Sequence, residues 1–363
     1  MLNSRLKNVK KQLKENNLEG VLISSVSNIT YLTGYVNFSK NEREAYLIVG
    51  EDFQYLITDA RYSEAVKKEV AHFTLFERNH QNKIEDLLKS LQKRIKTLGI
   101  EEDNLTVVEQ KMLNKYFKNL RHIEIGKHRA IKTAEEIKKI EQAAKLGDEA
   151  FKFILGKIKP GVSEQEIAFE LEFFIKRNRA ELSFPSIVAF GKNSAIPHHQ
   201  TGGTILSDQA GQFVLLDFGV KYENYCSDMT RTMFFGKPSE KQKRIYETVL
   251  KAQQKAIDYI HSAIKSGKKV MTAKADEVAR DYITSKDYPT IPHSLGHGIG
   301  LEVHEHPSLS PKSKEILKPG MVFSIEPGIY LPGFGGVRIE DLYVYEEKGL
   351  RQLTNSAKNM IVI

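Results

Sequence analysis

Residues 213–232 read FVLLDFGVKYENYCSDMTRT, two apolar and β-prone runs separated by a polar turn. Each run carries one aspartate, and Asp217 and Asp228 stand eleven positions apart. This spacing predicts two adjacent antiparallel strands joined by a turn at Tyr222, Glu223 and Asn224. Both carboxylates could then point into one pocket, where burying an unpaired charge would be costly. The stretch therefore indicates two strands that deliver two carboxylates to a cation.

Two further carboxylates have similar surroundings in the sequence. Glu326 lies in MVFSIEPG and Glu340 in GGVRIED, each inside or at the end of an apolar, β-prone run. Four separate ion pairs or edge-strand charges would be an alternative explanation. Because all four acids accompany consecutive strand-like runs, a shared pocket explains them with one cause.

Histidines crowd into one stretch, PHSLGHGIGLEVHEHP at residues 292–307, which holds His293, His297, His304 and His306. Four carboxylates and one imidazole satisfy two divalent cations better than one. Ligands that are rich in oxygen and free of thiols favour Mn²⁺, Fe²⁺ or Co²⁺, with Zn²⁺ also possible. Two such ions can share and activate a water molecule, so the residues themselves predict a dinuclear metallohydrolase.

Length and composition limit the kind of protein. A chain of 363 residues is too long for one ordinary core and predicts two domains. The 54 Lys and Arg against 46 Asp and Glu are scattered as mixtures of both signs, so we expect no nucleic-acid partner. Cys226 is the single cysteine, which excludes an intramolecular disulfide and a Cys-rich zinc site. The polar start and the lack of a long apolar run predict a cytoplasmic protein that does not enter the membrane.

The first part of the chain alternates helix-like and strand-like segments. Leu6, Val9 and Leu13 recur at helical spacing, and the short apolar runs GVLISS, AYLIVG and FQYLIT follow. This pattern predicts an α/β domain over residues 1–125. A basic and weakly apolar segment at residues 126–133 is the expected linker.

The second part, residues 134–363, has a different pattern. Thr133 with Glu136 predicts a capping box and a long helix that stops at Lys159-Pro160-Gly161, and Ser163 with Glu166 predicts another helix. From Ile187 onward we expect mainly strands, in the runs IVAF, FVLLDFGV, RTMFF, MVFSIEPGIY and VRIEDLYVY. The prediction is an α+β domain that holds the chemistry.

Five motifs, LLDFG, SDMTRT, HSLGHGIGLEVHE, SIEPGIY and VRIED, resemble in order and spacing those of the pita-bread metallopeptidases. This family includes methionine aminopeptidase, aminopeptidase P and prolidase. The likeness covers roughly residues 134–363 and implies a pita-bread catalytic domain of the creatinase/aminopeptidase type. Residues 1–125 resemble the N-terminal domain of the proline-specific branch, with NITYLTGY and TDARY at the expected places.

The resemblance implies a role for each matching residue. Asp217 becomes a ligand of one metal and His297 of the other, while Asp228 and Glu340 bridge the two. Glu326 becomes the fifth ligand, bonded to the attacking water as general base. All five are present, which argues against a metal-free scaffold that has kept only the fold.

The remaining histidines also match family positions. The resemblance assigns His293 and His304 to substrate contact and to stabilisation of the oxyanion. His198 is preferred over its neighbour His199 as the substrate-binding histidine of SAIPHHQTG, although the spacing leaves both possible. His306 has no match and is expected at the surface.

Three residues close to the ligands carry further expectations. Tyr330 matches a substrate-binding position near the scissile bond, or is a packed strand residue. Arg338 could anchor a substrate carboxylate, or could orient a ligand of the metals. Thr230 is expected to donate a hydrogen bond to a ligand carboxylate, and Cys226 to serve in packing.

The resemblance leaves the peptide substrate open between two enzymes. Aminopeptidase P removes the first residue before proline from longer peptides, and prolidase splits Xaa-Pro dipeptides. Prolidases commonly carry an arginine shortly after the HE-x-P motif, where this chain has Ser308 in HEHPSLS. The departure favours aminopeptidase P, with prolidase as the alternative. The N-terminal domain argues against methionine aminopeptidase and the metal ligands against creatinase, and the family implies a homodimer.

Overall fold

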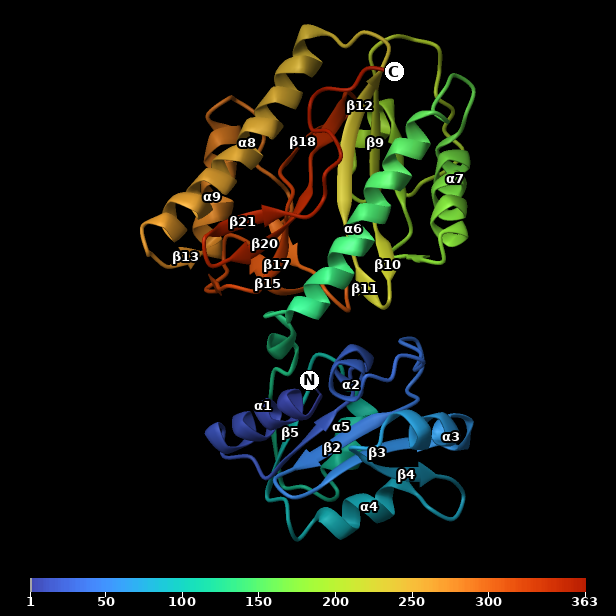
Figure 1. The fold of residues 1–363 in the computed structure, drawn as a ribbon, viewed down its shortest axis with the longest axis vertical. Coiled ribbons are helices and arrows are strands. Elements are labelled where there is room, and N and C mark those ends of the chain that lie inside the picture. The colour runs from blue at the N-terminus through green and yellow to red at the C-terminus, as the bar shows by residue number, and fades with distance from the viewer. Residues whose placement is uncertain (1) are drawn as a thin grey trace. The chain divides into compact units, whose positions relative to one another are not determined.

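The computed structural model describes residues 2–363, drawn in Figure 1. Two compact units divide the chain after Arg129. A short 3-10 helix, η1 (Gly126–Arg129), ends the first unit. Within residues 2–363, no helix is long and apolar enough to cross a membrane.

The first unit is built on a six-stranded sheet in the order β4-β3-β2-β1-β5-β6. Every residue of β1 and β2 is buried, which explains why both are continuous apolar runs. α1 buries Leu6, Val9 and Leu13, so the predicted helix is confirmed. The strands are β1 (Gly20–Ile23), β2 (Tyr46–Gly50), β3 (Gln54–Asp59), β4 (Thr74–Arg78), β5 (Thr97–Ile100) and β6 (Asn119–His122), and the helices are α1 (Leu2–Glu15), α2 (Val26–Thr33), α3 (Ala60–Glu69), α4 (Ile84–Leu91) and α5 (Val107–Leu113).

Four long helices belong to the second unit: α6 (Ala134–Leu155), α7 (Glu164–Arg177), α8 (Glu240–Lys265) and α9 (Thr272–Thr284). The capping boxes at Thr133 and Ser163 are confirmed. α6 ends at Gly156, before the predicted stop. α8 and α9 were not predicted, although Ser239 and Gln242 form a third capping box that begins α8.

Three groups of strands in the second unit carry the site, namely the sheets β12-β9-β8 and β15-β14-β17-β20-β21 and the pair β18-β19. The predicted hairpin is confirmed, because β12 pairs antiparallel with β9 and Glu223 and Asn224 turn the chain with φ of 45° and 70°. The elements are β7 (Glu181–Leu182), β8 (Ile187–Phe190), η2 (Gly191–Ala195), β9 (Gln212–Phe218), β10 (Val220–Tyr222), β11 (Tyr225–Cys226), β12 (Met229–Phe235), β13 (Val270–Met271), β14 (Gly296–Gly298), β15 (Glu305–Leu309), β16 (Ile316–Leu317), β17 (Val322–Ile325), β18 (Gly328–Leu331), β19 (Gly335–Arg338), β20 (Asp341–Glu346) and β21 (Gly349–Gln352).

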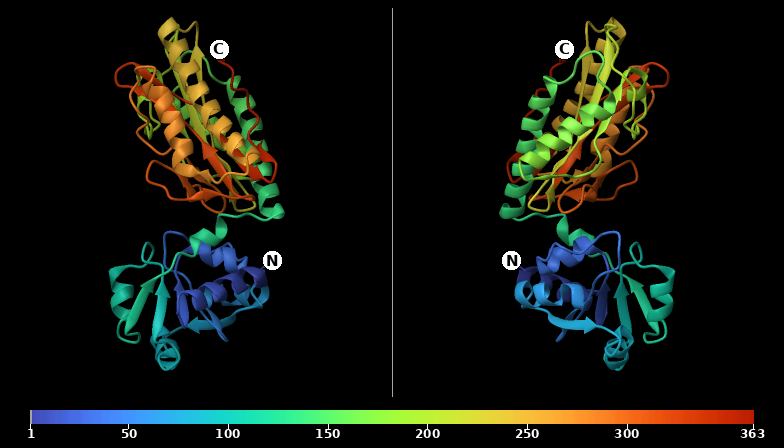
Figure 2. Two further views of the ribbon diagram at one scale, coloured as in Figure 1. Left: turned by 90° about the vertical axis from the view of Figure 1, so that its left-hand side faces the viewer. Right: turned by 90° about the vertical axis from the view of Figure 1, so that its right-hand side faces the viewer.

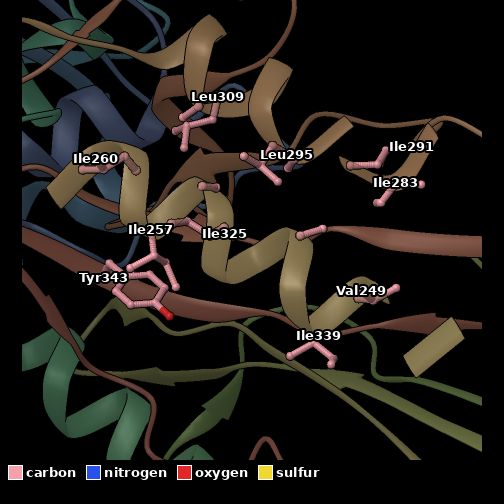
Figure 3. Close-up of a cluster of buried hydrophobic side chains, with 14 of the residues drawn as sticks. Val249, Ile257, Ile260, Ile283, Ile291, Leu295, Leu309, Ile325, Ile339 and Tyr343 are labelled. Carbon is pink, nitrogen blue, oxygen red and sulfur yellow. The ribbon is translucent and has the colours of Figure 1, made fainter. Parts of the chain in front are cut away.

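Within the second unit the helices cover the strands from two sides. Figures 1 and 2 show α8 and α9 on one side and α6 and α7 on the other. Figure 3 shows the apolar cluster under α8, where Ile257 and Ile260 belong to the same buried group as Ile325 and Ile339. Ile325 and Ile339 each directly precede a predicted metal ligand, Glu326 or Glu340. Core packing therefore fixes the backbone beside both carboxylates.

Candidate metal centre

Four of the five predicted ligands meet around the imidazole of His297 in β14. Its Nε2 lies 3.2 Å from Oε1 of Glu326, 3.7 Å from Oδ2 of Asp228 and 3.9 Å from Oε1 of Glu340. Asp228, His297 and Glu340 each offer one ligand atom, and these atoms all lie within 4.8 Å of one another. The side chains come from the start of β12, from β14, from the end of β17 and from between β19 and β20. Segments far apart in the sequence thus deliver one nitrogen and several oxygens to one place.

The fifth predicted ligand, Asp217, joins the group from β9. It pairs with Thr230 of β12, and Oγ1 of Thr230 donates a 2.7 Å hydrogen bond to Oε2 of Glu340. The hydrogen bond that was expected from Thr230 is therefore present. The charge of Asp217 also raises the pKa of Glu340, which places the two carboxylates within electrostatic reach.

Two oxygens in this group find no hydrogen-bond partner in the part of the chain that the structure describes. Asp228 is 4% exposed and Glu340 is 2% exposed. Oδ1 of Asp228 and Oε1 of Glu340 accept no hydrogen bond within residues 2–363. A buried acceptor without a partner costs about 1–3 kcal/mol, and a buried carboxylate costs more. Divalent cations would satisfy both oxygens, so the residues present fit metal ions.

The electrostatics of the metal-free group lead to the same conclusion. Burial and mutual repulsion hold the pKa of Asp228 and of Glu340 well above the usual range. Burial alone would lower the pKa of His297, but Glu326 and Glu340 outweigh it and raise this pKa to about 9. Burial would raise the pKa of Glu326, but His297 lowers it to about 2. These groups share protons because together they carry too much negative charge, which bound cations would neutralise.

Hydrogen bonds set the orientation of the His297 ring. Its Nδ1 lies 3.1 Å from the carbonyl oxygen of Gly298, so Nδ1–H donates there and Nε2 faces the carboxylates. In the metal-free chain Nε2 carries a proton toward Glu326, and a bound cation would replace that proton. Ser324 accepts from the His297 amide and donates to Glu326, both at 3.1 Å. Gly296 and Gly298 allow this packing, because a Cβ on either would lie 2.0 or 2.1 Å from a carbonyl oxygen of a neighbouring strand.

Arg338 of β19 forms hydrogen bonds with residues of the predicted metal site. Its side chain is buried, with Nη2 2.6 Å from Oδ2 of Asp217 and Nε 3.0 Å from Oγ1 of Thr230. Nη1 donates to the Tyr330 hydroxyl at 2.9 Å and to the Pro197 carbonyl at 3.3 Å. Arg338 was expected either to anchor a substrate carboxylate or to orient a ligand of the metals. These contacts support the second role, because all three guanidinium nitrogens are already bonded within the protein.

Tyr330 connects Arg338 to His293. The Tyr330 hydroxyl accepts from Arg338, which can only donate, and its own hydrogen can therefore go to Nε2 of His293 at 2.8 Å. Nδ1 of His293 lies 2.8 Å from the Ser294 carbonyl oxygen and donates to it. Burial lowers the pKa of His293, in keeping with a neutral ring.

His304 lies on the exposed side of the group, and its ring centroid is 4.3 Å from that of His297. Partial burial lowers the pKa of His304, and the positive charges of His297 and His198 lower it further. His198 is exposed and lies within electrostatic reach of His304. The preference for His198 over its neighbour stays a prediction.

His199 is engaged elsewhere. Its Nε2 lies 2.8 Å from Oε2 of Glu164, whose side chain is completely buried at the start of α7. Glu164 also accepts from the amide of Phe190 and from the side chain of Asn193. His199 thus belongs to the support of the loop that carries His198.

His306, which was expected at the surface, is partly exposed and has a partner that was not predicted. Its Nδ1 lies 2.9 Å from Oε1 of Glu315. The same carboxylate accepts a 2.7 Å hydrogen bond from the amide of Ser308. The sequence offered no local signal for this pairing, because Glu315 follows nine positions after His306 in an irregular segment.

Sequence reasoning also missed two ion pairs that border the site. Lys132 and Glu305 pair at 2.8 Å with side chains only 1% exposed, directly beside His304 in sequence. Asp276 and Arg280 of α9 pair at 2.5 Å next to the segment that carries His293. Glu305 stands in the HEHP motif, so the motif could have drawn attention to it. The pair of Asp276 and Arg280 gave no such signal, because the helix α9 was not predicted.

Comparisons with known proteins find similar sequences for both parts of the chain. Residues 138–347 match the model of metallopeptidase family M24, and residues 5–133 match the creatinase/prolidase N-terminal domain. An uncharacterised peptidase of Bacillus subtilis is 40% identical, with 95% of this chain and 96% of that protein covered. A Xaa-Pro dipeptidase of Pyrococcus horikoshii is 36% identical, with 99% of each chain covered.

Solved structures agree with the fold. The structure of a Xaa-Pro dipeptidase from Bacillus anthracis covers 100% of both chains with 35% identity and a TM-score of 0.90. That of an X-Pro aminopeptidase from Thermotoga maritima covers 99% of both with 32% identity and a TM-score of 0.83. The predicted fold class, an α+β pita-bread domain preceded by a smaller α/β domain, is confirmed.

Proposed function

The chain belongs to metallopeptidase family M24, and from this premise we propose that it hydrolyses the bond between an amino-terminal residue and a following proline. The observation that carries the proposal is the buried group of Asp228, His297, Glu326 and Glu340 with two unsatisfied carboxylate oxygens. We assign catalysis to residues 134–363, with residues 1–125 as the N-terminal domain and residues 126–133 as the linker. The matched ranges 138–347 and 5–133 support this assignment.

We assign two divalent cations to this site, where Asp217, Asp228, His297, Glu326 and Glu340 would hold them. Mn²⁺ is the first choice because the ligands are rich in oxygen, and Co²⁺, Fe²⁺ and Zn²⁺ are alternatives. When bound, the cations activate a water molecule and polarise the scissile carbonyl.

The chain's own residues orient the substrate and move protons. Glu326 lies 3.2 Å from His297, and we assign its carboxylate to hold a proton in transit toward the leaving proline nitrogen. We assign His304 to the carbonyl oxygen that becomes negative. His293, whose two ring nitrogens are bonded to the Ser294 carbonyl and the Tyr330 hydroxyl, is assigned to contact with the substrate. His198 completes the wall of the site on the exposed side.

Our proposal for the length of the peptide substrate rests on the residue at position 308. Ser308 of β15 stands opposite His297 of β14, and directly paired residues of antiparallel strands have side chains on the same face. The carboxylate beside it belongs to Glu315. A dipeptide would place its own carboxylate near this negative charge, whereas a longer peptide would not. We therefore propose an Xaa-Pro aminopeptidase acting on peptides longer than two residues.

Xaa-Pro dipeptidase activity is the second candidate. It is supported by the relatives of Pyrococcus horikoshii and Bacillus anthracis, which carry that name and match nearly the full chain. Arg338 gives this candidate little support, because its donors are bonded within the protein.

The test compares an Xaa-Pro dipeptide with the matching Xaa-Pro-Xaa tripeptide after chelator treatment and addition of Mn²⁺. Cleavage of the tripeptide supports the aminopeptidase, and cleavage of the dipeptide alone supports the dipeptidase. Glu326→Gln is the control, since it should keep the fold and lose nearly all turnover. Cleavage of neither peptide would reject Xaa-Pro specificity, and metal analysis would still count the two equivalents expected of the site.

We further propose that the enzyme acts in the cytoplasm as a homodimer on proline-containing peptides, without nucleic-acid or membrane partners. Size-exclusion chromatography with light scattering at working concentration tests the dimer directly. A monomer that retains full activity would contradict it.

A further inference from the structure

The segment that carries His293 has no regular secondary structure. It runs from the end of α9 at Thr284 to the start of β14 at Gly296. Its backbone groups therefore need partners from outside a helix or sheet. Figure 3 labels Ile291 and Leu295 of this segment, which belong to the same buried apolar cluster as Ile283 of α9.

Between these apolar anchors, one ion pair of α9 bonds the backbone on both sides of the histidine. Asp276 and Arg280 are one helical turn apart, and Nε and Nη2 of Arg280 lie 2.5 and 3.0 Å from the two carboxylate oxygens. Arg280 also donates to the carbonyl oxygens of Ile291 and His293. Oδ1 of Asp276 accepts a 3.0 Å hydrogen bond from the Leu295 amide.

We propose that Asp276 and Arg280 are positioning residues that fix the His293 imidazole, and with it the bond to the Tyr330 hydroxyl, in the substrate site. The inference rests on the proposed function and deepens it, because it assigns to α9 the placement of a residue in that site. Arginine suits the task, since its planar guanidinium donates in several directions at once while bonded to a carboxylate. Asp276 is completely buried, so its charge depends on this partner.

The chain from α9 to the substrate has two steps. Arg280 fixes the carbonyl of His293, and the ring of His293 is then aligned by the Ser294 carbonyl and the Tyr330 hydroxyl at 2.8 Å each. If the backbone moves, the ring loses both alignments. A displacement of ~1 Å in a catalytic site can reduce the rate by roughly 100-fold.

A double-mutant cycle between Arg280→Lys and His293→Ala tests the proposal. Lysine keeps the positive charge beside Asp276 but cannot reproduce the several directed bonds. We expect Arg280→Lys to lower kcat/KM about tenfold in the wild-type background and less than twofold when His293 is already alanine. An equal loss in both backgrounds would show a general structural role and would overturn the proposal.

The matched control lies on the same helix. Lys274 pairs with Glu277 at 2.6 Å on the exposed face of α9, so Lys274→Met removes a cation without touching the His293 segment. This variant should keep wild-type kcat/KM. If Lys274→Met lowered kcat/KM as much as Arg280→Lys does, the proposal would also be overturned. The loss would then follow from any change to α9 and not from the bonds of Arg280.

Hydrogen exchange of the full-length chain gives a readout that does not depend on substrate. Arg280→Lys should raise the exchange rate of the Leu295 amide at least tenfold, whereas Lys274→Met should leave it unchanged. If the wild-type chain cleaves no Xaa-Pro peptide, the proposed function fails while this measurement still decides the positioning role. Unchanged exchange in Arg280→Lys would reject it.

Discussion

The guanidinium of Arg338 donates a hydrogen bond of 2.6 Å from Nη2 to Oδ2 of Asp217, a residue 121 positions earlier in the chain. Both side chains are largely buried. Burial raises the pKa of Asp217, and the Arg338 charge opposes that rise, so the arginine favours the ionised carboxylate that a cation requires.

Arg338→Lys is therefore expected to weaken metal binding and to lower kcat by roughly 10- to 100-fold, because outer partners of metal ligands have effects of this size. Metal titration and steady-state kinetics measure both quantities. The dipeptide and the tripeptide should lose activity equally. A loss confined to the dipeptide would instead identify Arg338 as the anchor of a substrate carboxylate.

The two neighbouring histidines should separate function from stability. His198→Ala removes an exposed side chain, so it should raise KM several-fold and leave the melting temperature unchanged. His199→Ala removes a partner of the fully buried Glu164, so it should lower the free energy of unfolding by about 1–3 kcal/mol. Thermal melting and peptide kinetics on both variants provide the comparison. A stability loss in His198→Ala and a KM increase in His199→Ala would instead make His199 the substrate-binding histidine.

The hairpin of Asp217 and Asp228 could be predicted because its information is local: two β-prone runs, a turn and the spacing between them. The capping boxes at Thr133 and Ser163 were readable for the same reason. The interpretation failed where contacts join distant segments. Nothing local in the sequence says that Glu164 accepts from His199.

α8 illustrates a different limit. Its first turn has a readable cap at Ser239 and Gln242, but the helix contains many lysines and glutamines that obscure the buried stripe. That stripe packs against β17 and the link between β19 and β20, where Ile325 and Ile339 belong to the same cluster. The Asp276 and Arg280 pair went unnoticed because it depends on α9 and on a segment without regular structure.

The metal-free protein should lose stability as the pH rises. The pKa of His297 is about 9 in the folded chain and ~6.5 when unfolded, so its charged form stabilises the fold. This contribution is complete below about pH 6.5 and is lost as the pH rises through 9. The raised pKa values of Asp228 and Glu340 act in the same direction, because the folded chain binds their protons more tightly. The lowered pKa of Glu326 contributes stability that is lost only in acid, as the pH falls toward about 2.

Melting of chelator-treated protein at about pH 6.5 and pH 9.5 should show a loss of roughly 2–3 kcal/mol at the higher pH. Mn²⁺ should stabilise the chain more at the higher pH, because the cations replace the protons that the ligands release. His297→Gln should reduce the dependence in this range. A flat profile in the wild type would contradict the proton sharing inferred for the group.

Ser308→Arg should shift the substrate preference toward dipeptides. The side chain at this position lies on the same strand face as His297, so an arginine there would bring a cation to the end of a bound Xaa-Pro dipeptide. We expect the ratio of kcat/KM for dipeptide over tripeptide to rise about tenfold, since a hydrogen bond to a charged group contributes ~1.5–3 kcal/mol. Kinetics on both peptides measure the ratio.

Two further variants make this test specific. Ser308→Met fills similar space without charge and should leave the ratio unchanged. Glu315 could capture the new arginine, because its carboxylate already accepts from the Ser308 amide at 2.7 Å, so the combination of Ser308→Arg with Glu315→Gln should show the larger shift. An unchanged ratio in this double variant would place the substrate terminus elsewhere and would remove Ser308 from the argument for an aminopeptidase.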